Sequence, residues 1–78
     1  IPSPTYQVTE SGKVVVKIKV DRNGTVVDAQ PGDAGTNFTN KTAWDAAKKA
    51  AMNTQFNMKP DASEYQYGTI TYIFNITK

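Results

Sequence analysis

The side chains that most often carry out chemistry in enzymes are sparse in this sequence. It contains no histidine and no cysteine, so the usual general base near neutral pH, the common metal ligands and a thiol nucleophile are all missing. The carboxylates stand apart along the chain, at Glu10, Asp21, Asp28, Asp33, Asp45, Asp61 and Glu64. No pair has a spacing that indicates acid–base catalysis or a metal site. We therefore expect a protein that is not an enzyme and binds no metal or cofactor.

One short stretch, Asp21-Arg22-Asn23-Gly24, has a weak likeness to the start of a calcium-binding loop. The acidic ligands that should follow it are missing, however. A hairpin turn explains the same residues better, because Asn-Gly supplies the positive φ that a tight turn needs.

The binding of single-stranded nucleic acid is a second candidate chemistry. Lys13, Lys17 and Lys19 lie on one face of a predicted strand, and Tyr67 and Tyr72 lie in another strand. A basic sheet that carries aromatic side chains can stack bases. The period of the second strand, however, turns Tyr72 to the opposite, apolar side, and the net charge is only +2. The lysines are better explained as a solvated face that discourages aggregation, so we expect no nucleic acid partner.

The strongest structural signal lies near the C-terminus. The run Gly68-Thr-Ile-Thr-Tyr-Ile-Phe-Asn-Ile76 is rich in β-branched and aromatic residues and contains no proline. Its period of two gives one apolar face (Ile70, Tyr72, Phe74, Ile76) and one more polar face (Thr69, Thr71, Ile73, Asn75). We expect an edge strand, whose unpaired amide and carbonyl groups an extended peptide can complete.

Two further strands are expected near the N-terminus. Alternation predicts one over Lys13–Asp21 and a partner over Thr25–Gln30, which the following proline ends. The facing of the second strand is open. A strict period places Val27 and Ala29 on one face, whereas a bulge after the turn brings Val26 inward instead.

A helix is expected after the loop Gly32–Thr39. Thr39, Asn40 and Thr42 are the candidate N-caps, and Asp45 can complete a capping box with Thr42. Small side chains share the inner face and let the helix lie close to a sheet; they are Ala43, Ala47, Ala50 and Thr54, flanked by Trp44 and Ala51. The helix is expected to end near Asn53–Gln55, with Phe56 packed under it and Pro60 blocking any continuation.

These elements predict a single α+β domain. The order is β-β-α-β, with a three-stranded antiparallel sheet of strand order 2-1-3 and one helix packed on one face. We interpret residues 1–11 as the end of a linker, with a short extended piece at Tyr6–Val8, and residues 12–78 as the domain. Because the chain begins Ile1-Pro2-Ser3-Pro4, we expect it to be a piece of a longer protein. No apolar run approaches the roughly 20 residues of a membrane span.

Taken in order, these segments resemble the C-terminal domain of the TonB family. The likeness rests on Gly12-Lys-Val-Val-Val-Lys-Ile-Lys-Val-Asp21 with Asn23-Gly-Thr-Val-Val-Asp-Ala29, on the helix that precedes Phe56 and Pro60, and on the final run to Ile76. It covers residues 12–76, nearly the whole chain. The Tyr-Pro motif that precedes the domain in some members is absent, since Tyr6 is followed by Gln7.

The resemblance implies the periplasmic domain of an energy transducer. Such a protein is anchored in the inner membrane by an N-terminal helix, is powered by the ExbB–ExbD complex, and grips the Ton box peptide of outer-membrane receptors to drive nutrient uptake. We place the docking edge on the last strand and on the three residues that precede Gly68. The expected contact residues are Tyr65, Gln66, Tyr67, Gly68, Thr69, Ile70, Thr71, Tyr72 and Ile73.

Two alternatives stay open at this point. The last strand can instead pair with a second copy of the chain, giving a homodimer. Four Asn-x-Thr sequons, at Asn23, Asn37, Asn40 and Asn75, would suit a structural or adhesion module of a surface or secreted protein. Chance in a chain rich in asparagine and threonine explains them as well, because Asn75 lies inside a predicted strand.

Overall fold

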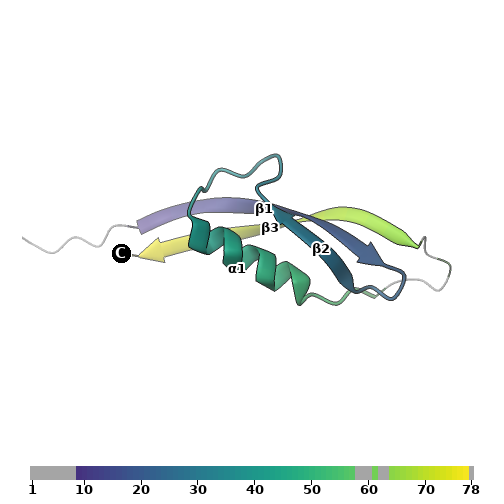
Figure 1. Cartoon of the computed structure of the whole chain (residues 1–78). Coiled ribbons are helices and arrows are strands. Elements are labelled where there is room, and N and C mark those ends of the chain that lie inside the picture. Colours follow the sequence, from purple (N-terminus) through teal and green to yellow (C-terminus); the bar gives the residue numbers. More distant parts are fainter. Residues whose placement is uncertain (1–8, 58–60, 62–63, 78) are drawn as a thin grey trace, which may run out of the picture.

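The chain folds as a small sheet with one helix on it. A computed structural model describes residues 9–57, 61 and 64–77. In chain order the elements are β1 (Thr9–Asp21), β2 (Val26–Pro31), α1 (Lys41–Met52) and β3 (Tyr65–Thr77). β1 lies in the centre and pairs antiparallel with β2 on one side and β3 on the other (Figure 1). The predicted β-β-α-β order and the strand order 2-1-3 are confirmed.

The longest pairing in the sheet is that between β1 and β3. Its register is unbroken over 13 residues of each strand, from Thr9 opposite Thr77 to Asp21 opposite Tyr65. Both strands are longer than the sequence pattern indicated. β1 begins at Thr9, so the last three residues of the predicted linker belong to the sheet, and β3 begins three residues before Gly68. The expected extended piece at Tyr6–Val8 and the helix-blocking Pro60 lie outside the described residues.

The hairpin between β1 and β2 contains a bulge. Lys19 pairs with Asp28 but Val20 pairs with Val26, so Val27 is an extra residue in β2. The bulge turns Val26 inward, where 2% of its surface is exposed, and leaves Val27 43% exposed. Of the two alternatives for this strand, the bulged one is therefore correct. Pro31 is the last residue of β2 rather than its terminator.

Helix α1 begins with a different cap from the capping box. Asn40 is the N-cap, and its side-chain Oδ1 accepts a hydrogen bond of 3.0 Å from the backbone N–H of Ala43. The capping box from Thr42 to Asp45 is wrong, because Thr42 already lies within the first turn. The helix ends at Met52, and Asn53 is its C-cap.

The core lies between the helix and the inner face of the sheet. Buried alanines of α1 meet buried valines and Ile18 of β1; the helix residues are Ala43, Ala47 and Ala51. Ala50, expected on this face, is exposed. The helix packs mainly over β2 and β1 and touches β3 less (Figure 1). As a result the apolar side chains of β3 are only half-buried against the core.

A loop residue completes the core. Phe38 is 7% exposed and its ring stacks on that of Phe74, with 6.0 Å between the ring centroids. Gly12 makes the room, since a Cβ there would come within 2.8 Å of the Phe38 side chain. The indole N–H of Trp44 donates to the backbone carbonyl of Phe38, which ties the loop to the helix.

Candidate functional site

The two edges of the sheet differ in how they are covered. Beyond the end of β2, the loop after Pro31 lies along β1. The Lys13 N–H donates to Asn37 Oδ1 (2.7 Å) and the Val15 N–H to Thr36 Oγ1 (2.9 Å). On the far side of β3, by contrast, no described residue pairs with the strand. We call that side of β3 the open edge.

The open edge lacks the usual protection against pairing. β2, the opposite edge strand, is short, bulged and ends in proline, three devices that discourage unwanted pairing. β3 has 13 residues, and its sequence YQYGTITYIFNIT contains neither a charged residue nor a proline. Natural sheets seldom leave so long an uncharged strand at an edge unless something uses it.

All nine residues expected to contact a partner lie on β3, in one continuous stretch. The register divides them between the two faces. Tyr65, Tyr67, Thr69, Thr71 and Ile73 are on the outer face, opposite Asp21, Lys19, Lys17, Val15 and Lys13. Gln66, Gly68, Ile70 and Tyr72 are on the inner face, toward the helix, opposite Val20, Ile18, Val16 and Val14. A strand added at the open edge would meet both rows.

The outer face carries lysine and tyrosine side chains together. Lys19 Nζ lies 4.1 Å from the ring centroid of Tyr65 and 6.0 Å from that of Tyr67. Such contacts stabilise the ammonium group over the ring by about 0.5–1 kcal/mol at an exposed site. Tyr67 remains 67% exposed and Ile73 70% exposed. This face therefore offers both positive charge and uncovered aromatic surface beside the open edge.

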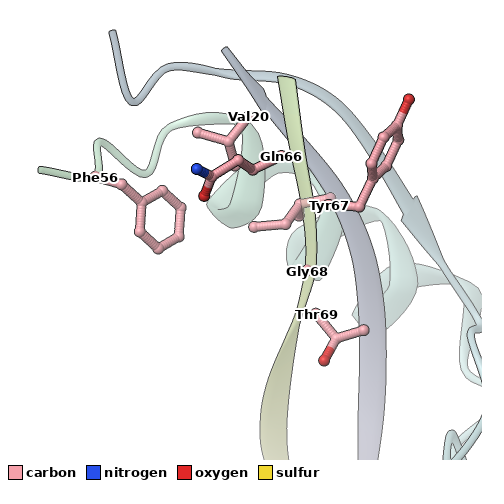
Figure 2. A pocket seen from close by; sticks show the side chains of 7 residues that line it. Val20, Phe56, Gln66, Tyr67, Gly68 and Thr69 are labelled. Atoms are coloured by element: carbon pink, nitrogen blue, oxygen red, sulfur yellow. The ribbon is translucent and has the colours of Figure 1, made fainter. Parts of the chain in front are cut away.

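The inner face holds a groove next to Gly68. Its volume is about 190 Å³, and it is lined by Ile18, Val20, Phe56, Gln66, Tyr67, Gly68 and Thr69. Figure 2 shows the Phe56 ring across an open space from β3, while the Tyr67 side chain points away to the other face. We call this space the Gly68 groove.

The far wall of the Gly68 groove is held in place by the hairpin turn. The Phe56 N–H donates to the Gly24 carbonyl at 2.8 Å, and Gln55 Nε2 donates to the Asn23 carbonyl at 2.7 Å. Thr25 and Gln55 also form an isolated antiparallel bridge. These contacts fasten the segment after the helix to the turn. The sequence indicated only that Phe56 packs under the helix.

Sequence reasoning placed the site on β3 but missed what surrounds it. Ile18 and Val20 were expected only as part of the predicted strand Lys13–Asp21, and the position of Phe56 across the groove from β3 was not foreseen. This position of Phe56 depends on the bridge between Thr25 and Gln55, which are 30 positions apart. One signal was available. Gly68 interrupts an otherwise bulky strand, and an isolated glycine in a strand often marks a close approach by another group.

Metal binding and membrane insertion have no support in the described residues. Within residues 9–57, 61 and 64–77, no three carboxylates gather closely enough to hold a metal ion. In the same residues, no helix has both the length and the hydropathy needed to cross a bilayer. Comparison of the chain with protein-family models, with curated proteins and with solved structures found no match.

Proposed function

We propose that this domain binds an extended peptide by adding it as a fourth strand to the open edge of β3. The observation that supports this most directly is the contrast between the edges. The loop after β2 forms hydrogen bonds with β1, whereas no described residue pairs with the far side of β3. Strand addition is a common form of peptide recognition, in which the backbone supplies affinity and alternate side chains supply specificity.

The energetics favour a weak, reversible complex. A peptide of about five to seven residues forms roughly four to six backbone hydrogen bonds, each with a net value of about 0.5–1.5 kcal/mol. Association costs at least about 4 kcal/mol. Backbone pairing alone therefore gives dissociation constants of about millimolar to micromolar, and side-chain contacts must supply the rest. Backbone pairing also tolerates sequence variation, which suits a domain that serves several partners.

The biological setting that we propose follows from the resemblance to the TonB C-terminal domain. In that role the domain is non-catalytic and lies in the periplasm, as part of a transducer anchored in the inner membrane. Its partners are the Ton box peptides of outer-membrane receptors, and the ExbB–ExbD complex acts through the part that precedes the domain. The ordered segments of residues 12–76 support this proposal, and so does the open edge of β3, the strand on which the family would need a docking edge.

Amide chemical-shift mapping tests the proposal. A synthetic seven-residue peptide copied from a receptor's Ton box is titrated into the ¹⁵N-labelled protein. We expect the largest shifts along Tyr65–Ile73, with smaller ones in the facing residues of β1. A shuffled peptide of the same composition serves as control. Shifts confined to α1 or to the β1–β2 turn would overturn the proposal.

Pairing of β3 with a second copy is the competing function, and it suits a structural or adhesion module. It is favoured by the same unprotected edge, because an uncharged strand of this length can pair with itself. Sedimentation equilibrium separates the two. A monomer that binds peptide supports the transducer role, whereas a tight dimer that peptide does not dissociate supports the structural one.

A further inference from the structure

Two glycines on the inner face of the β1–β3 pair leave gaps in the row of side chains. Gly12 lies opposite Phe74, and Gly68 lies opposite Ile18. The first gap is filled by the chain itself, since a Cβ on Gly12 would lie 2.8 Å from the Phe38 side chain. The second is not filled. The nearest atom to a Cβ on Gly68 is Ile18 Cγ1, at 4.0 Å.

The unfilled gap has the size and lining of an aromatic site. An apolar cavity of roughly 150 Å³ is enough to hold benzene, and the Gly68 groove measures about 190 Å³. Its floor is formed by Ile18 and Val20, of which 4% and 6% are exposed, and its far wall by the half-buried Phe56. Gln66 also lines the groove, and its polar side chain extends from β3 toward Phe56 (Figure 2).

The register determines which residue of a partner would reach the groove. In a sheet, side chains directly opposite each other on neighbouring strands point to the same face. A residue paired with Gly68 across the open edge would therefore point toward the helix side, as Ile18 does on the other side of Gly68. Helix α1 covers β3 less than it covers β1 and β2. The side chain of the partner residue would therefore reach Phe56 without meeting a residue of the helix.

Charge indicates what should flank that residue. The next position of a partner would face outward beside Thr69, which lies opposite the exposed Lys17. Thr69 is short enough for the long lysine side chain to reach across it. β3 itself has no carboxylate to offer, so a second copy pairing through β3 would leave Lys17 without a partner in the added strand. A peptide with acidic residues at outward positions complements this face.

From these observations we propose that the Gly68 groove selects the partner, by taking one large apolar or aromatic side chain of an extended acidic peptide at the position paired with Gly68. This inference rests on the proposed strand addition and specifies its sequence preference. The groove would accept a side chain of the peptide in the same way that the gap at Gly12 accepts the side chain of Phe38.

The test uses a series of nine-residue peptides and the whole chain. Each peptide has threonine or valine at inward positions and glutamate at outward positions, and a central residue that is alanine, leucine or phenylalanine. Dissociation constants come from NMR titration, which also reports which amides shift. For the unchanged protein, we expect phenylalanine or leucine to bind at least about tenfold tighter than alanine, because burial of a large apolar side chain is favourable.

Filling the groove from within should abolish that preference. Gly68→Val places apolar atoms where the nearest neighbour of a Cβ is 4.0 Å away, so the strand can accept it. In this variant we expect the three peptides to bind within about twofold of one another, with an intermediate preference for Gly68→Ala. Asn75→Val, on the outer face beyond the docking stretch, is the control and should keep the full preference. Replacing the glutamates by glutamine should weaken binding by about two- to fivefold.

The outcomes separate the two proposals. A preference for large side chains that persists unchanged in Gly68→Val overturns the groove inference. If the alanine peptide still shifts β3 amides in that case, strand addition itself stands. If no peptide shifts β3 amides, both proposals fail. A dimer through β3 that the phenylalanine peptide cannot dissociate also overturns the groove inference, because a second copy then occupies the edge.

Discussion

The Gly24 carbonyl accepts a hydrogen bond of 2.8 Å from the Phe56 N–H, and together with the contacts of Gln55 to Asn23 and Thr25 this bond joins the β1–β2 turn to the segment that follows the helix. It also sets the position of the Phe56 ring, which forms the far wall of the Gly68 groove. A turn residue at one end of the sheet thus helps to shape the proposed binding surface beside another strand, β3. The approach is close because residue 24 has no side chain.

Gly24→Ala should therefore destabilise the domain strongly. Gly24 has φ +84°, and a Cβ there would come within 1.9 Å of the Phe56 carbonyl oxygen. We expect a loss of at least about 2 kcal/mol in the free energy of unfolding, from backbone strain and steric overlap, measured by urea denaturation. Gly68→Ala is the matched control and should change stability by less than about 1 kcal/mol, in the stabilising direction. Equal effects of the two substitutions would contradict the contact between the turn and Phe56.

The N-terminus of the helix offers a sharp comparison between two polar residues. Asn40→Ala removes the oxygen that accepts from the Ala43 N–H, and should lower stability by about 1 kcal/mol. Thr42→Ala should be close to neutral, because Thr42 lies inside the first turn and the structure assigns it no capping role. Thermal unfolding of both variants checks this. A larger loss for Thr42→Ala would restore the capping box that the sequence indicated.

The stacked rings of Phe38 and Phe74 should be energetically coupled. Phe38→Ala removes a buried ring from the core and should cost about 3 kcal/mol. In a double-mutant cycle with Phe74→Ala, we expect a coupling energy of about 0.5–1.5 kcal/mol beyond the separate losses. Strictly additive losses would mean that the loop residue does not fill the Gly12 gap against Phe74.

Much of the fold could be predicted because its signals are local and periodic. The alternation in Lys13–Asp21 and in Gly68–Ile76 indicated both long strands and the apolar face of the second, and the Asn23-Gly24 turn indicated the hairpin. The strand order followed from the handedness of crossovers. For β2 the sequence left a strict period and a bulge as open alternatives, and the buried Val26 shows that the bulge is present.

The features that escaped prediction depend on contacts between distant parts of the chain. Phe38 lies in a loop without any periodicity, so nothing local showed that it enters the core. The start of β1 at Thr9 is set by pairing with Thr77, 68 positions away, rather than by the polar residues around it. Likewise the Gly68 groove exists only because Phe56 is fastened to the hairpin turn. The strand that we propose for docking could be named from the sequence, but the groove beside it could not.

Amide hydrogen exchange along β3 tests the central claim most directly. In an antiparallel strand, alternate amides point to opposite sides, so one set of β3 amides bonds to β1 and the other faces the open edge. In the free protein we predict slow exchange for the first set and exchange at least about tenfold faster for the second. A saturating Ton box peptide should slow the second set and leave the first unchanged. Equal protection of both sets before any peptide is added, or no change in the fast set when it is present, would contradict strand addition at β3.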